Sequence, residues 1–263
     1  MLAMCSPSHR ASRLPLNEGA LSLATRDVSV RVRADTAFEA SDVLRDDREA
    51  TMPTLPIERL HEERANVASH ALGVLLAIAA MPVLAAEAAA RNPARDLGVW
   101  IFAATMLLLY AVSSIYHAVP VGRSKVWWKR LDHAAIYLFM AGSFTPFALG
   151  HALGAPLLAG VWLVAGIGMV LKLSGFLRNK ALSTALYLAF GWFVLAAAQP
   201  LLAALGRDGM LWLLAGGIAY TTGTVFFVLD QRLRFGHFVW HLFVLVGSVC
   251  HLMAVLKHAG AMA

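Results

Sequence analysis

Continuous runs of apolar residues recur along the chain from residue 67 to residue 256, without the alternation of polar and apolar positions that membrane barrel strands show. A helix needs about 20 residues to cross a hydrocarbon core about 30 Å thick. Lipid provides no partner for backbone groups, and a helix satisfies them internally. The pattern therefore predicts an all-α membrane protein with seven spanning helices, at about 67–90, 97–119, 131–150, 155–174, 181–205, 209–229 and 238–256.

Glycine and proline indicate where these spans are separated and where they pack. The third and fourth spans are divided by Gly154 and Pro156, in a stretch that carries no charged residue. Small residues within spans allow helices to approach closely. Such residues are Gly166, Gly168, Gly216 and Gly217.

The composition supports a membrane protein. Hydrophobic residues make up 59% of the 263 residues and charged residues 14%. Soluble domains have roughly 45–50% apolar and about 25% charged residues, so too little polar surface remains to cover a globule. The net charge of +6 does not indicate nucleic-acid binding, because the basic residues lie in short gaps between apolar runs and no nucleic-acid motif is present. The two cysteines, Cys5 and Cys250, form no disulfide framework or metal clip.

Residues 1–56 differ from the rest of the chain. They hold seven Arg and eight acidic residues and show no sustained apolar period. No apolar core precedes a small-residue cleavage site, so the segment is not a secretory signal. We expect a disordered tail, or a segment outside the native protein if Met52 is the true start. Residues 57–263 form the predicted membrane domain.

The distribution of Lys and Arg predicts the orientation. If the amino terminus lies in the cytoplasm, the inner segments hold 18 of these residues and the outer segments hold 4. An excess of basic residues marks the cytoplasmic side. The amino terminus is therefore expected inside and the carboxyl terminus outside, opposite to G-protein-coupled receptors. A retinal protein is disfavoured, because the seventh span has no central lysine.

Ionisable side chains within spans are costly unless they are paired, coordinated or hydrated, so each is a candidate for function. The second span runs inward, which puts His117 at its cytoplasmic end. The third and seventh spans start inside, which puts Asp132, His237 and His241 at the same end. Three segments distant in sequence thus place ligand-type side chains within about 6 Å of the inner boundary.

The spacing of these residues favours a metal site. His237 and His241 are four residues apart on a helix and share one face, so both can bind one ion. Ser113 has the same spacing from His117. Three imidazoles leave a fourth zinc position open, which is typical of catalytic zinc. Asp132 could then hold a water molecule by a hydrogen bond or act as a general base.

Several alternatives remain open at this stage. Two histidines at helical spacing near a membrane boundary are often only interfacial, and imidazole also binds copper, iron or nickel. A haem held by two histidines would leave Asp132 without a role. His70 is a candidate for supporting the ligands or for a capping role. His133 points about 100° away from Asp132, and His251 lies about 15 Å beyond His241.

Four segments resemble the signatures of the hemolysin III family: EERANVASHALG, SSIYHAV, LDHAAIYLFMAGSFTPF and HFVWHLFVLVGSVCHL. This is the bacterial branch of the progestin and adipoQ receptors, in a superfamily that includes the adiponectin receptors and alkaline ceramidases. The resemblance covers about residues 60–256. Arg64 departs from the pattern, since a small or apolar residue is more usual there.

The resemblance implies seven helices with a cytoplasmic amino terminus, in the inner membrane of a bacterium. It also implies a zinc ion held by His117, His237 and His241. Asp132 contacts the water on the zinc in that pattern, and Ser113 belongs to the same motif.

The activity that the resemblance implies is divided. Adiponectin receptors and ceramidases are associated with hydrolysis of a lipid amide, which makes a membrane lipid the expected substrate or ligand. The bacterial branch is named for haemolytic, pore-forming activity. A receptor-like sensor with structural zinc is a third hypothesis. A pore requires a continuous polar path, whereas the ionisable residues of the spans gather at the inner end. The residues therefore favour a zinc-dependent hydrolase.

Overall fold

The computed structural model describes residues 57–88, 93–149, 154–193 and 198–261. These residues form seven α-helices and no strand, so the all-α prediction is confirmed for the described part of the chain. The predicted tail, residues 1–56, lies outside it. The helices are α2 (Ile57–Ala88), α3 (Pro93–Ala118), α4 (Arg123–Ala148), α5 (Gly154–Leu173), α6 (Lys180–Phe193), α7 (Ala198–Val228) and α8 (Gly236–Ala261).

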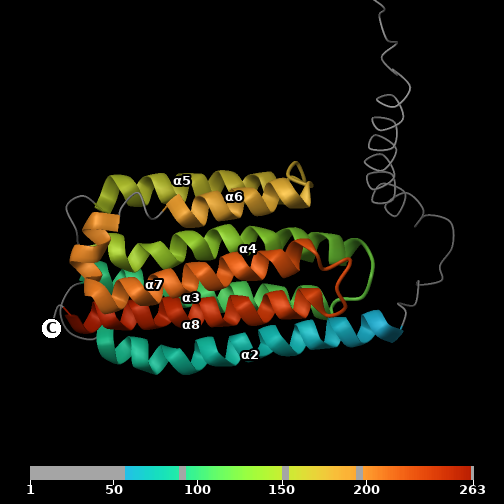
Figure 1. The fold of residues 1–263 in the computed structure, drawn as a ribbon, viewed down its shortest axis with the longest axis horizontal. Helices are drawn as coiled ribbons and strands as arrows, with labels where there is room; N and C mark the ends of the chain where they lie inside the picture. The colour runs from blue at the N-terminus through green and yellow to red at the C-terminus, as the bar shows by residue number, and fades with distance from the viewer. Residues whose placement is uncertain (1–56, 89–92, 150–153, 194–197, 262–263) are drawn as a thin grey trace, which may run out of the picture. The chain divides into compact units, whose positions relative to one another are not determined.

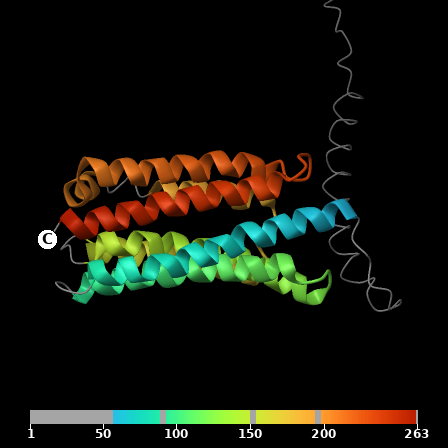
Figure 2. The same cartoon turned by 90° about the horizontal axis from the view of Figure 1, so that it is seen from below.

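The helices run side by side in a bundle (Figures 1 and 2). From the top of Figure 1, α5 and α6 lie above α4 and α7, which lie above α3 and α8, and α2 lies at the bottom. Helix α8 packs along both α7 and α2, and α3 packs along both α2 and α4. The largest fully buried side chains include Tyr110, Phe102 and His241, so an imidazole is part of the core.

Five of the described helices are long and apolar enough to cross a membrane. The qualifying segments are Arg59–Ala86, Asp96–Ala118, Gly154–Leu173, Leu205–Val228 and Gly236–Lys257. Helix α6 has 14 residues, and α4 carries several charged residues in its first three turns. The described residues thus confirm a multi-pass membrane protein, while seven crossings stay a prediction.

Two predicted boundaries can be compared with the structure. The predicted break near residue 150 is confirmed, because α4 ends at Ala148 and α5 begins at Gly154. The predicted fifth span, 181–205, is divided differently: α6 ends at Phe193, and residues 198–205 belong to α7. Helix α7 bends at Gly206, where φ is +65°. Glycine adopts this backbone conformation without the steric cost that other residues have.

One end of the bundle gathers the basic residues of the described chain. The start of α2 and the α3–α4, α5–α6 and α7–α8 connections all lie at this end, on the right of Figure 1. They carry most of the described Lys and Arg residues, including Arg123, Lys125, Lys180 and Arg232. The four segments predicted to share one side of the membrane therefore lie together.

Close helix packing is found at some of the predicted glycines but not at all of them. A Cβ atom built on Gly168 would lie 2.5 Å from the Tyr137 ring, and one on Gly216 would lie 2.5 Å from His251. Gly217 has only an ordinary contact, with Trp192 at 3.6 Å. The prediction was wrong for Gly166, which has no atom within 4 Å of such a Cβ and faces outward.

Gly166 and Gly168 provide a matched test of this packing. We expect Gly168→Ala to destabilise the protein by about 1–3 kcal/mol, because the added methyl group overlaps the Tyr137 ring. Gly166→Ala should be neutral or slightly stabilising, since alanine is the better helix former. Thermal unfolding in detergent measures both, and equal stability of the two variants would contradict this account.

Candidate metal centre

Two helices bring three histidines together at the basic end of the bundle. His117 lies in the last turn of α3, and His237 and His241 lie in the first two turns of α8. One ligand atom from each lies within 4.8 Å of the others. His117 and His241 are buried and His237 is half-buried. The structure thus brings together the three residues that the sequence predicts as metal ligands.

The start of α8 is fixed by the chain around it. Phe235 has a φ of +57°, which turns the backbone sharply before Gly236 begins the helix. The Phe235 backbone N–H donates a hydrogen bond to Glu62 Oε1 at 3.0 Å. Because Glu62 lies on α2, this contact sets the position of His237 relative to a third helix.

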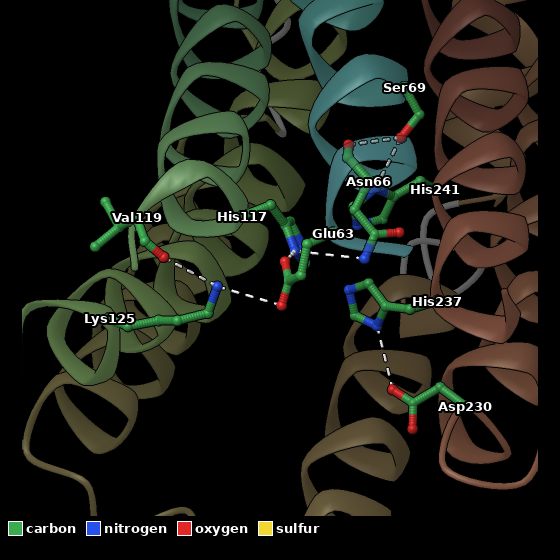
Figure 3. A network of polar contacts seen from close by, with 9 residues as sticks. All are labelled: Glu63, Asn66, Ser69, His117, Val119, Lys125, Asp230, His237 and His241. Atoms are coloured by element: carbon green, nitrogen blue, oxygen red, sulfur yellow. Dashed lines mark hydrogen bonds and ion pairs between the residues drawn. The ribbon is translucent and has the colours of Figure 1, made fainter. Parts of the chain in front are cut away.

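Each of the three imidazoles has an oxygen partner at Nδ1 (Figure 3). His117 Nδ1 lies 2.7 Å from Glu63 Oε2, and His237 Nδ1 lies 3.2 Å from Asp230 Oδ2. A carboxylate only accepts hydrogen bonds, so the Nδ1 atoms of both imidazoles carry hydrogens. Asn66 Nδ2, at 3.5 Å from His117 Nδ1, is a much longer contact.

The third imidazole is oriented by a hydroxyl. Ser69 Oγ donates its hydrogen to Asn66 O at 2.8 Å and lies 2.9 Å from His241 Nδ1. The single hydroxyl hydrogen is already used, so His241 Nδ1 donates to Ser69 Oγ. All three imidazoles therefore have their hydrogen on Nδ1 and a lone pair on Nε2.

This donor set fits a metal ion. A neutral imidazole binds metal through the nitrogen without hydrogen, while the other nitrogen donates to an oxygen that fixes the ring. His117 Nε2 is buried and has no hydrogen-bond partner among the described residues. Zinc is commonly bound by three histidines in this way, although nitrogen ligands do not by themselves identify the metal.

Asp132 and Ser113 lie beside the three histidines without joining them. Both are buried, with exposed fractions of 7% and 1%. Together with His237 and His241 they line a cavity of about 180 Å³. Asp132 is within electrostatic range of His117 and His237 but is not part of the three-residue group. Ser113 Oγ has no hydrogen-bond partner within the described chain.

The remaining histidines take different places. His70 stacks on His241 with ring centroids 3.5 Å apart, so it supports a predicted ligand from behind. His133 lines the cavity and packs edge-on against Phe227, and His251 packs against Tyr220. None of the three belongs to the group that could hold the ion.

The sequence analysis missed Glu63, Ser69 and Asp230, the partners of the three Nδ1 atoms. One face of α2 carries Glu63, Asn66, Ser69 and His70. Asn66 and Ser69 each follow the preceding residue of this set after three positions, and His70 lies four positions after Asn66. That periodicity was a usable signal. Asp230 lies in the turn before α8, where no periodicity marks it.

Asp230 has two basic partners. Its Oδ1 atom lies 2.6 Å from Lys180 Nζ, and its Oδ2 atom contacts His237. Burial raises the pKa of the Asp230 carboxyl, but the hydrogen bonds from His237 and Lys180 and the charge of Lys180 outweigh burial and hold this pKa below its ordinary value. Asp230 is therefore an ionised acceptor for His237.

Comparisons with known proteins show the family to which the chain belongs. The model of the family described as "Haemolysin-III related" matches residues 58–252, which include all of the residues above. The chain belongs to this family. It is 40% identical over 201 residues to the Hemolysin-3 homolog of Bacillus subtilis, a match that covers 75% of this chain and 94% of that protein.

Two further relatives show how widely this family extends. Hemolysin-3 of Bacillus cereus is 38% identical over 199 residues, covering 74% of this chain and 90% of that protein. The human monocyte to macrophage differentiation factor is 28% identical over 207 residues, a match that covers 75% of this chain and 84% of that protein. The resemblance identified from the signature segments is thus confirmed for the hemolysin III family.

The three histidines should hold one metal ion per chain. We expect purified protein to contain about one equivalent of zinc and the double variant His237→Ala with His241→Ala to contain almost none. Elemental analysis of detergent-purified protein measures this. His61→Ala is the control, because His61 is an exposed histidine near the start of α2, at the same basic end of the bundle as the three histidines. Equal metal content in the double variant would contradict the site.

Proposed function

We propose that the protein is a zinc-dependent hydrolase that cleaves an amide or acyl bond of a membrane lipid. One observation carries this proposal: two of the three clustered imidazoles, those of His237 and His241, line a mostly apolar cavity together with the buried carboxylate of Asp132. A bound zinc ion would lower the pKa of a water molecule and polarise a carbonyl group.

Asp132 is the proposed general base. It lines the cavity beside His237 and His241, and its carboxylate can accept a proton from the attacking water. The same group can then deliver that proton to the departing amine or alkoxide. Ser113, with a buried and unpartnered hydroxyl, can donate a hydrogen bond to Asp132 or to the substrate and so orient either one.

The rest of the cavity suits a hydrocarbon chain. Its wall is formed largely by aliphatic and aromatic side chains of α4 to α8, including Phe139, Phe144, Leu188 and Trp240. Burial of a ligand's apolar groups against such a surface is favourable, and the surface offers few hydrogen bonds to water. A lipid with its scissile carbonyl at the polar end matches this division.

Pore formation, which the name of two relatives suggests, has less support. A conducting path needs polar groups along its length. In the described residues, the ionisable groups that line the cavity are concentrated near Asp132, with His251 farther along. The apolar wall therefore favours a bound lipid over a column of water.

We also propose that the protein spans a bacterial inner membrane seven times with its amino terminus in the cytoplasm. The basic end of the bundle supports this orientation, because positive residues are retained on the cytoplasmic side. The metal centre would then lie near the cytoplasmic face, where a lipid of the inner leaflet could enter.

Asp132→Asn tests the catalytic proposal. We expect hydrolysis to fall at least about 100-fold, as is usual on loss of a general base, while zinc content stays near that of the unmodified protein. The assay follows release of amine or fatty acid from a panel of lipid amides and esters in micelles. Asp208→Asn serves as the control, since Asp208 is exposed and lies on α7, which carries neither Asp132 nor any of the three histidines.

Two results would contradict the catalytic proposal in different ways. Full activity in Asp132→Asn would remove Asp132 as the base. Metal-loaded protein without turnover on any lipid in the panel would favour a receptor-like sensor with structural zinc.

Single cysteines test the orientation. In a chain without Cys5 and Cys250, we expect a cysteine at exposed Ser124 to react with a membrane-impermeant maleimide only after cell lysis. A cysteine at exposed Arg207 should react in intact spheroplasts. The reverse pattern would invert the proposed topology.

A further inference from the structure

Two lysine–carboxylate pairs approach the metal centre from different helices. Glu63 on α2 places Oε2 against His117 Nδ1 at 2.7 Å and Oε1 against Lys125 Nζ at 3.2 Å. Asp230 in the α7–α8 turn places Oδ2 against His237 Nδ1 at 3.2 Å and Oδ1 against Lys180 Nζ at 2.6 Å. In both cases one carboxylate oxygen faces the histidine and the other faces the lysine.

The two pairs are partly shielded from solvent. The Asp230 and Lys125 side chains are 10% and 15% exposed, and Glu63 is 27% exposed. Lys125 also donates a hydrogen bond to Val119 O at 3.2 Å, just after the end of α3 (Figure 3). Charged hydrogen bonds are shorter and stronger than neutral ones, and low exposure limits screening by salt. Both carboxylates are therefore held firmly.

We propose that Glu63 and Asp230 are the positioning residues of the metal centre, with Lys125 and Lys180 holding each carboxylate against its histidine. This inference rests on the proposed metal binding. Neither carboxylate needs to touch the metal or the substrate. Each fixes one imidazole so that its Nε2 lone pair, and not its N–H, faces the site, and each makes that nitrogen a stronger donor.

The lysines have a second consequence for the charge of the centre. A histidine hydrogen bond alone would leave each carboxylate with a free oxygen and nearly its full negative charge. Lys125 and Lys180 occupy those oxygens and offset the charge. The carboxylates are thereby kept from becoming metal ligands, and the ion retains its positive charge for polarising a substrate.

The third ligand provides an internal comparison. His241 has neutral partners, the hydroxyl of Ser69 at Nδ1 and the Asn66 backbone, and no carboxylate. A charged acceptor strengthens a hydrogen bond about twofold relative to a neutral one. Loss of Glu63 or Asp230 should therefore weaken metal binding more than loss of Ser69.

Zinc affinity, measured by competition with a chromogenic chelator on the full-length protein in detergent, tests this inference. We expect Glu63→Gln and Asp230→Asn each to weaken zinc binding about 10- to 100-fold. Ser69→Ala, Lys125→Gln and Lys180→Gln should weaken it less. Asp208→Asn and Lys257→Gln are the matched controls, because they remove exposed charges on other parts of α7 and α8 and should leave affinity unchanged.

Two further measurements separate positioning from a general structural role. The metal-free variants should unfold within a few degrees of the metal-free unmodified protein. In the cobalt-loaded protein, Glu63→Gln and Asp230→Asn should shift the visible absorption bands, because the ligand orientation changes, and the controls should not. If a glutamine or asparagine variant does not fold, the corresponding lysine variant provides the test, with a smaller loss of zinc affinity expected.

The outcomes distinguish this inference from the proposed function. Zinc bound by all variants with unchanged affinity and unchanged cobalt spectra would overturn the positioning role and leave the metal site intact. An unmodified protein that binds no zinc would overturn both. Weaker binding in the carboxylate variants, together with normal binding in the controls, would support the inference.

Discussion

Lipid contains no hydrogen-bonding solvent, and this constraint governs the interior of the bundle. A buried polar group without a partner costs free energy, so the chain must provide the partner itself. At the basic end, three side chains from α2 and the α7–α8 turn meet this requirement for three imidazoles: Glu63, Ser69 and Asp230. Lys125 and Lys180 in turn pair with the two carboxylates. His117 Nε2, on the opposite side of its ring, is buried without a partner in the described residues, and one ligand atom from each of the three rings lies within 4.8 Å of the others, which is why the arrangement points to a cation.

The same contacts link helices where apolar packing alone is weakly specific. In a membrane, lipid tails are as apolar as leucine, so polar contacts and close packing decide which helices associate. Glu63 joins α2 to the end of α3 and, through Lys125, to α4. Asp230 joins α8 to α6 through Lys180. The metal centre is thus also the point where helices distant in sequence are fixed relative to one another.

Much of the fold could be predicted because membrane helices follow from continuous apolar runs. The cluster of three histidines could be predicted too, since His237 and His241 share a helical face and His117 ends a span at the same depth. Glu63 and Asp230 were missed because both lie just outside the predicted spans, and only ionisable residues within spans were taken as candidates. Gly166 was misjudged because the sequence shows that a residue is small but not what its face of the helix contacts. A Cβ on Gly168 would meet Tyr137, whereas one on Gly166 would meet no atom within 4 Å.

Charge balance links the positioning proposal to the proposed chemistry. Two carboxylates facing a divalent ion directly would neutralise it and weaken its pull on a carbonyl. Paired with Lys125 and Lys180, they instead orient two imidazoles at little cost in charge. Asp132, the buried carboxylate, instead lines the cavity beside His237 and His241, where a bound substrate could reach it. A carboxylate held in that position is suited to accept a proton, whereas one tied to a lysine is suited to hold a ring in place.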